Sequence, residues 1–321
     1  MKNEISVIVP VYNGEKDIRK TLLSLIDQTL PVDIIVVNDG SKDNTEMVVK
    51  QLIEEYPETN IHYFYKENGG ISDARNFGIS KVETPYFGFL DSDDNCISNA
   101  FELLYNALKK EDAKIAFGGF TWVYEDGSTR ISMDTGYRDK KELITKMYNT
   151  LWNKLYDTKW FKSTGIVFPK GLRYEDTSCL TKLALFMDKV AYVEVPLVNY
   201  IQHPGSITHT YNHNISDMIQ VFEGIRQFYR EHDAYDEYRE EIEYVVIRFF
   251  LGSNFLRASR IADKTLKKQV LDEAWNYLND NYPDYRKNKY LKQGGLKNLY
   301  FKHCGKFVYY NCGWLLRKII K

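Results

Sequence analysis

Phe89-Leu90-Asp91-Ser92-Asp93-Asp94 decides the fold class, because it places three carboxylates directly after a run that has the character of a buried strand, residues 85–90. Open α/β sheets bind their ligands at the edge formed by the carboxyl ends of their strands. Carboxylate oxygens suit Mg²⁺ or Mn²⁺, and such ions usually share their coordination shell with substrate phosphates. Taken alone, the stretch also fits a solvated acidic turn.

Three further strands are predicted upstream, over residues 5–12, 32–37 and 61–65. Each ends in a polar turn and is followed by apolar residues at helical spacing. Strands and helices that alternate in this way form βαβ units and a mostly parallel sheet. We therefore expect the strand ends near Tyr12, Asp39, Asn68 and Asp91 to face one crevice. Polar residues gather at these ends, which favours a nucleotide site.

Four motifs of this region are similar to those of the family-2 glycosyltransferases of GT-A fold, including bacterial cell-surface polysaccharide and teichoic-acid type enzymes. They occur in order and at the usual spacing: Val9-Pro10-Val11-Tyr12-Asn13, Asn38-Asp39-Gly40-Ser41, Ala74-Arg75-Asn76-x-Gly78 and Leu90-Asp91-Ser92-Asp93-Asp94. The resemblance implies a Rossmann-like, mostly parallel sheet flanked by helices. The family's usual Asp-Asp-Gly-Ser is Asn-Asp-Gly-Ser here, and the aspartate that addresses the uracil ring matches Asp39.

The resemblance also implies roles for the donor-binding side chains. Tyr12 would stack on a pyrimidine while Asp39 accepts a hydrogen bond from the base edge. Arg75 would reach a phosphate or a sugar hydroxyl. A surface ion pair of Arg75 with Asp73 or Glu67 is the alternative.

The metal ligands implied by the resemblance are Asp93, Asp91 and His203, for Mn²⁺ or Mg²⁺. His203 and Ser206 lie in a polar loop, where family members often carry a basic residue and a serine in a mobile segment over the diphosphate. An ordinary surface position is the alternative for this histidine. The complete set expected to bind the nucleotide sugar is Pro10, Tyr12, Asp39, Asn68, Arg75, Asp91, Ser92, Asn153, Lys154, His203 and Ser206.

Glycosyl transfer also needs a base for the acceptor hydroxyl. Glu175 and Asp176 precede a predicted apolar helix, and the resemblance implies that Asp176 is the base and Glu175 its helper. First-turn capping is the alternative. A lone carboxylate base without a second nucleophile predicts one in-line displacement, with inversion at the anomeric carbon. Upstream, Asn153 and Lys154 offer hydrogen bonds to a sugar, and Trp152 offers a flat face unless it is a core residue.

The chain is long enough for one sizeable α/β domain and an appendage. We expect a catalytic domain over residues 1–210 and a helical C-terminal region over residues 211–321, because residues 215–282 carry apolar positions at helical spacing. No run approaches the 18 apolar residues of a membrane span. The four cysteines form no Cys-x-x-Cys pair and no signal peptide is recognised, so a reducing cytoplasm is expected.

The C-terminal tail is strongly basic. Residues 286–321 carry ten Lys or Arg and no acidic residue, so the first 285 residues carry −11 of the net charge of −1. If residues 299–321 form a helix, an apolar face opposes a basic one, and the apolar face is made of Cys304, Val308, Cys312, Leu315 and Ile319. This pattern predicts peripheral attachment to the anionic inner face of the plasma membrane. Packing on the catalytic domain is the alternative. No nucleic-acid-binding fold is recognised.

The expected function is therefore inverting, metal-dependent transfer of a sugar from a UDP-sugar to a hydroxyl of a cell-surface glycan or lipid-linked precursor. A nucleotidyltransferase would need a Gly-rich phosphate loop with Lys or Arg after the first strand, and residues 9–15 are not one. A degenerate sugar-binding or scaffold protein would have lost its carboxylates. Asp91, Asp93, Glu175 and Asp176 are all present.

Overall fold

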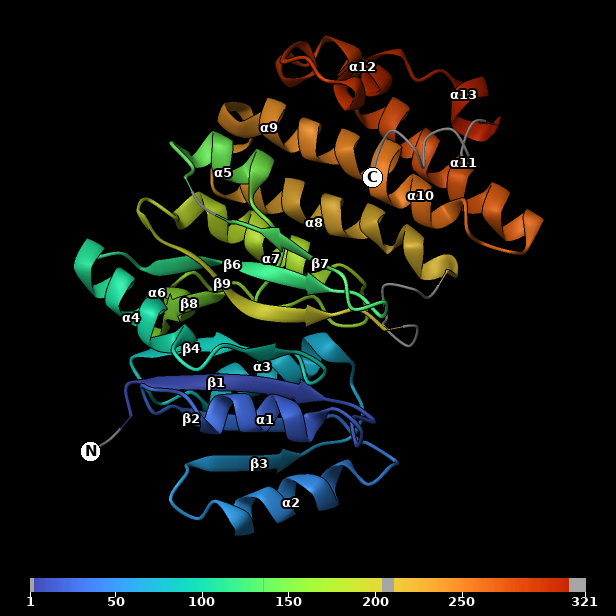
Figure 1. Ribbon diagram of the computed structural model, residues 1–321. Helices are drawn as coiled ribbons and strands as arrows, with labels where there is room; N and C mark the ends of the chain where they lie inside the picture. Colours follow the sequence, from blue (N-terminus) through green and yellow to red (C-terminus); the bar gives the residue numbers. More distant parts are fainter. Residues whose placement is uncertain (1–2, 135, 204–210, 312–321) are drawn as a thin grey trace. The chain divides into compact units, whose positions relative to one another are not determined.

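The computed structural model describes residues 3–134, 136–203 and 211–311, which belong to two compact units (Figure 1). Unit 1 comprises Met1–Tyr137, Tyr148–Gly171 and Leu183–Ser206. Unit 2 comprises Arg138–Met147, Leu172–Lys182 and Ile207–Lys321. Two short segments from the middle of the chain are thus part of the predominantly C-terminal unit.

Unit 1 begins with the alternation of strands and helices that the sequence predicts. The strands are β1 (Ile5–Val11), β2 (Asp33–Asn38), β3 (Ile61–Tyr65) and β4 (Tyr86–Phe89), and the helices between them are α1 (Ile18–Ile26), α2 (Thr45–Glu55) and α3 (Ile71–Lys81). The strands pair in parallel in the order β3-β2-β1-β4. Every residue of β1 and β2 is buried, as expected for parallel strands covered on both faces. The carboxyl ends of the strands therefore share one edge.

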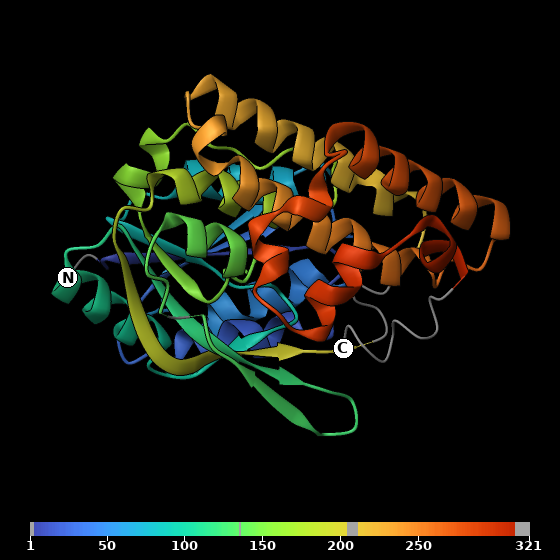
Figure 2. The same ribbon diagram turned by 90° about the horizontal axis from the view of Figure 1, so that it is seen from above.

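The remainder of the sheet is mixed. From β4 it continues through β8 (Lys154–Asp157), β6 (Ile115–Val123) and β9 (Val190–Ile201) to β5 (Asn95–Cys96), and β7 (Thr129–Ser132) pairs with β6. β8 is antiparallel to both its neighbours, whereas β6 and β9 are parallel. The sheet as a whole is less parallel than predicted, because antiparallel strands need no helical crossover to mark them in the sequence. Figure 2 shows the β6–β7 hairpin extending from the sheet.

An aromatic cluster holds β4 in place. The ring of Phe87 lies 5.2 Å from that of Tyr156 and 5.1 Å from that of Phe161, which belongs to α6 (Thr158–Ser163). Phe89 packs edge-on against Phe87 at 5.5 Å. Complete burial of each aromatic side chain is worth about 1.5–3 kcal/mol. The acidic residues after β4 therefore start from a rigid strand end. α4 (Ala100–Glu111) covers β6 and β9 of the same unit.

Unit 2 is helical, which confirms the helical C-terminal region. Its main helices are α5 (Lys140–Lys146), α7 (Glu175–Leu183, which ends in unit 1), α8 (Asp217–Glu231), α9 (Tyr235–Arg248), α10 (Asn254–Ala258), α11 (Lys264–Asn281), α12 (Leu296–His303) and α13 (Lys306–Asn311). A π-helical turn, Phe249–Ser253, joins α9 to α10. Among the residues that the structure describes, no helix has both the length and the apolarity needed to cross a membrane.

The described part of the tail is not the continuous helix considered for residues 299–321. α12 ends at His303 and α13 starts at Lys306, so the helix is interrupted at Cys304 and Gly305. Glycine costs about 1 kcal/mol relative to alanine within a helix, which is consistent with a break at this point. Residues 312–321, with Cys312, Leu315 and Ile319, lie outside the described residues.

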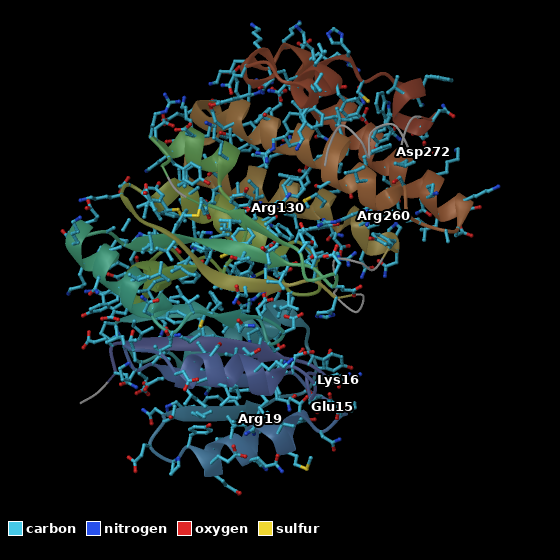
Figure 3. All side chains as sticks on the ribbon, in the orientation of Figure 1. Glu15, Lys16, Arg19, Arg130, Arg260 and Asp272 are labelled. Carbon is cyan, nitrogen blue, oxygen red and sulfur yellow. The ribbon has the colours of Figure 1, made fainter. Side chains whose placement is uncertain are left out.

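The described part of the tail packs within unit 2. Cys304 and Tyr309 are buried, and the Tyr309 ring lies 5.0 Å from Phe255 and 5.1 Å from Trp275. Tyr310 donates a hydrogen bond to Asp272, which Figure 3 labels on α11. Cys304, the first residue of the predicted apolar face, therefore packs inside unit 2.

Candidate functional site

The loops after β1 and β2 are tied to each other. The backbone N–H of Asn13 donates to Ser41 Oγ at 2.9 Å, and the Asn13 side chain accepts a hydrogen bond from the backbone of residue 42 at 2.8 Å. Glu15 and Lys16, labelled in Figure 3, follow in the same turn. At the start of this turn the Tyr12 side chain is 53% exposed. Its ring therefore has an accessible face for stacking on a flat ligand.

The carboxylate of Asp39 organises the turn after β3. Its two oxygens accept the backbone N–H groups of Gly69 at 3.0 Å and Gly70 at 2.8 Å, and the Asn68 side chain donates to the Asp39 carbonyl at 2.9 Å. Gly40 has φ +76°, and a Cβ there would lie 2.8 Å from the Asn68 nitrogen, so only glycine fits. A carboxylate can accept about four hydrogen bonds, which leaves capacity for a base edge.

Lys66 belongs to the same edge, although the sequence interpretation did not include it. Its Nζ lies 2.6 Å from Asp39 Oδ1 and 2.6 Å from Asp73 Oδ2, and Asp73 also pairs with Lys170. Burial opposes the charge of Lys66, but the bonds to the two aspartates outweigh it and raise the pKa of this ammonium. The only sequence signal is its position directly after β3.

Arg75 on α3 pairs with Asp91 and with neither of the residues considered as alternatives. Its Nη2 lies 2.9 Å from Asp91 Oδ1, and the guanidinium lies 5.7 Å from the centroid of the Phe168 ring. The arginine is buried. Two of the predicted donor-binding motifs, which are 16 residues apart, thus meet in one ion pair at the edge of the sheet.

The acidic residues after β4 meet the end of β9. His203 Nε2 lies 2.8 Å from Asp93 Oδ2. Burial, followed by the charge of Asp91, raises the pKa of Asp93, and the contact with His203 offsets part of this. Asp94 is buried, and its Oδ1 accepts the backbone N–H of Ile201 at 2.8 Å. Burial and then the charges of Asp93 and Asp91 raise the pKa of Asp94 well above its usual range.

These carboxylates suit a divalent cation. No three His, Cys, Asp or Glu side chains among the described residues form a ready-made metal-binding group. Mg²⁺, however, usually takes one or two carboxylates and completes its shell with phosphate and water oxygens. The buried Asp94 Oδ2 has no hydrogen-bond partner in the described structure, and the charges of Asp93 and Asp91 disfavour the ionised form of Asp94. A bound cation would relieve both.

The remaining predicted donor-site residues are placed as follows. Pro10 lies in β1. The last residue of β1 that pairs with β4 is Ile8, which lies opposite Phe89, so Pro10 does not need to donate a backbone hydrogen bond to β4. The Ser92 carbonyl accepts a hydrogen bond from Thr21 Oγ1 at 2.9 Å. Ser206 lies outside the described residues.

Asn153 and Lys154 lie in the core and do not face a ligand. Both are 0% exposed. Asn153 Nδ2 donates to the Gly118 carbonyl at 2.6 Å, and Lys154 Nζ lies 2.7 Å from Asp134 Oδ2, with both members of this ion pair fully buried. Their polar atoms are already taken up by these buried partners, which is inconsistent with the predicted contact with a sugar, so we leave them out of the site. Trp152, also buried, is a core residue.

Glu175 and Asp176 form the first turn of α7 in unit 2. Both are partly buried, and Asp176 Oδ1 accepts the backbone N–H of Thr177 at 2.6 Å. A helix N-terminus favours negative charge, so the position suits carboxylates in either of the two expected roles. Tyr174, the residue before the pair, has φ +66°, which is uncommon outside glycine.

Several known proteins resemble this chain. The model of "Glycosyl transferase family 2" matches residues 6–170. An uncharacterized glycosyltransferase, YibD of Escherichia coli (strain K12), is 27% identical over 270 residues, which cover 77% of this chain and 78% of YibD. Among solved structures, residues 1–349 of S. aureus TarS in complex with UDP align with a TM-score of 0.63 and 21% identity, covering 91% of this chain and 93% of that one.

A second solved structure carries a metal. The mannosyltransferase PcManGT from Pyrobaculum calidifontis, in complex with GDP-Man and Mn²⁺, aligns with a TM-score of 0.53 and 15% identity, over 99% of this chain and 84% of that one. At these identities the two structures show a shared fold.

Proposed function

Because this chain belongs to glycosyl transferase family 2, we propose that it is a glycosyltransferase that moves a sugar, with inversion, from a UDP-sugar to a hydroxyl of a cell-surface glycan or lipid-linked precursor. The observation that carries the proposal is the edge of the sheet in unit 1. There the Arg75–Asp91 ion pair joins two of the family motifs, and Asp93, which belongs to one of them, contacts His203.

The donor nucleotide would bind at the ends of β1 and β2. The exposed ring of Tyr12 would stack on the uracil, and Asp39 would accept its N–H. Lys66, which contacts the same carboxylate, would hold the Asp39 side chain in place. The complex of TarS with UDP supports a uridine nucleotide.

Asp93 and Asp91, with His203, are the residues that would hold Mn²⁺ or Mg²⁺. When bound, such a cation neutralises the charge that develops on the leaving diphosphate. Arg75, fixed by Asp91, would add positive charge near the same oxygens. The Mn²⁺ in PcManGT supports a divalent cation in this fold.

Asp176 would take the proton from the acceptor hydroxyl, and Glu175 would orient the acceptor. The deprotonated oxygen would then attack the anomeric carbon opposite the departing UDP. One displacement of this kind inverts the configuration at that carbon.

The surface of α12 and α13 supports a peripheral place at the cytoplasmic face of the membrane. Leu296, Leu299 and Phe307 are 72%, 57% and 75% exposed, and we name these three residues the α12–α13 surface. Exposed lysines, among them Lys297 and Lys306, lie on the same helices. Apolar side chains with basic neighbours favour an anionic leaflet, where each basic residue is worth about 1 kcal/mol.

A panel of UDP-glucose, UDP-N-acetylglucosamine, UDP-galactose and GDP-mannose tests the function. We expect the purified protein to release UDP slowly from at least one UDP-sugar when Mn²⁺ or Mg²⁺ is present, and Asp39→Ala to abolish this release. Release from GDP-mannose alone would contradict the proposed donor. Undiminished release in EDTA would contradict the proposed cation.

A further inference from the structure

The junction of α9 and α10 in unit 2 contains a buried amide without partners. The π-helical turn Phe249–Ser253 leads into Asn254, and such turns within helices are frequent at functional sites. Asn254 is 1% exposed, and neither its Oδ1 nor its Nδ2 has a hydrogen-bond partner in the described structure. A buried polar group that stays unpaired destabilises a fold, so its presence indicates a ligand or a bound water.

A cation lies one helical turn from this amide and packs on a phenol. Arg257 is three residues after Asn254, so the two side chains share a face of the helix. The Arg257 guanidinium lies 5.0 Å from the centroid of the Tyr174 ring, and Arg257 forms no ion pair with any carboxylate among the described residues. The Tyr174 hydroxyl is buried and likewise has no hydrogen-bond partner there. Tyr174 directly precedes the proposed catalytic pair.

Arg173 adds a second guanidinium to the same place. Its backbone N–H donates to Asp217 Oδ2 at 3.0 Å. Burial lowers the pKa of the Arg173 guanidinium, and the charge of Arg257 lowers it further, while Tyr174, Asp217 and Glu175 act in the opposite direction. Two guanidinium groups that repel each other in a half-buried place are stabilised by an anion between them.

We propose that these four residues form a binding subsite for an oxyanion carried by the acceptor, at the start of α7. The oxyanion subsite is defined by Arg173, Tyr174, Asn254 and Arg257. The two guanidinium groups would bind a phosphate or carboxylate, because their planar forks match its oxygens. The amide and the phenol would bind hydroxyls that flank it. The acceptor would thus be an anionic glycan or polyol whose reactive hydroxyl reaches Asp176.

The identity of the ligand as acceptor rests on the proposed function, whereas binding of an oxyanion does not. The first experiment therefore omits donor and metal. Full-length protein is titrated calorimetrically, at constant ionic strength, with glycerol 1-phosphate, with glycerate and with glycerol. We expect binding of glycerol 1-phosphate or glycerate and none of glycerol. The anion that binds more tightly indicates whether the acceptor group is a phosphate or a carboxylate.

Substitutions assign this binding to the subsite. Arg257→Gln should lower the affinity for the anion by about tenfold or more, as expected for the loss of a charge-assisted contact. Arg257→Lys should lower the affinity less. Arg260→Gln is the matched control, because Arg260 is exposed, lies just after α10 (Figure 3) and contacts Tyr211. The control should bind as the wild type does.

Asn254→Leu separates a ligand contact from a structural role. This change replaces an unpaired buried amide by an apolar group of similar size. It should therefore raise the melting temperature of the protein while lowering its affinity for the anion. Equal affinity in wild type, Arg257→Gln and Asn254→Leu, or absence of any anion binding by the wild type, would overturn the proposal. Failure of UDP release in the donor panel leaves these titrations intact, so the two proposals can fail separately.

Discussion

Replacing Lys154 by methionine should strongly destabilise unit 1, because Lys154 is one half of a fully buried ion pair. Its Nζ lies 2.7 Å from Asp134 Oδ2, 2.8 Å from the Thr150 carbonyl and 2.9 Å from Asn153 Oδ1. Methionine fills similar space but leaves Asp134 as a buried charge without its cation. Removing one partner of a buried pair costs about 3–5 kcal/mol. Tyr137 still donates a hydrogen bond to Asp134, so we expect the lower part of this range.

The assay is urea unfolding followed by tryptophan fluorescence, because Trp122 and Trp152 both lie in unit 1. The free energy of unfolding should fall by about 3 kcal/mol in Lys154→Met. The double variant Lys154→Met/Asp134→Leu should recover most of the loss, since an apolar pair of similar volume is often as stable as a buried ion pair. Lys114→Met is the control, because Lys114 forms an exposed pair with Asp157. It should cost about 0–1 kcal/mol.

A particular combination of results would refute this reasoning. Suppose that the free energy of unfolding of Lys154→Met falls by less than about 1 kcal/mol, the value typical of an exposed pair, while the affinity for UDP-sugar also falls. Lys154 would then face a ligand. The folded fraction of Lys154→Met should instead bind the donor as the wild type does.

Three further predictions concern catalysis, the cation and the membrane. Asp176→Asn should keep donor affinity and lose transfer by about 10²–10⁴-fold, measured as sugar incorporation, because the base is gone; a parallel loss of donor affinity would make Asp176 a binding residue. EDTA should inactivate the enzyme and Mn²⁺ or Mg²⁺ restore it, and Asp93→Asn should resist this rescue; full activity in EDTA would contradict the cation. Replacing Leu296, Leu299 and Phe307 by serine should release the protein from anionic vesicles in a flotation assay without changing UDP release; unchanged flotation would exclude the α12–α13 surface as the contact.

The sequence alone determined the elements whose signals are local. β1 to β4 and the helices between them are read from the spacing of apolar residues, because burial in a parallel sheet leaves its mark on each strand separately. The position of the acidic residues after β4 follows from the same pattern. The resemblance to the family motifs then implied roles for individual side chains, which the spacing of apolar residues cannot indicate. The helices of residues 217–281 also follow from apolar spacing.

Only the tertiary structure decided which side chains meet. From the sequence, Lys154 seemed suited to bind a sugar. Its partner in the fold, Asp134, lies 20 residues earlier in the chain, so the spacing of neighbouring residues does not reveal the ion pair. The partner of Arg75 and the place of Lys66 likewise depend on how separate strands come together in the sheet. The unpaired amide of Asn254 has no mark in the sequence at all, because an asparagine looks the same whether its hydrogen bonds are made or missing. Burial and pairing are properties of a side chain's surroundings, and those surroundings come mostly from residues distant in the chain.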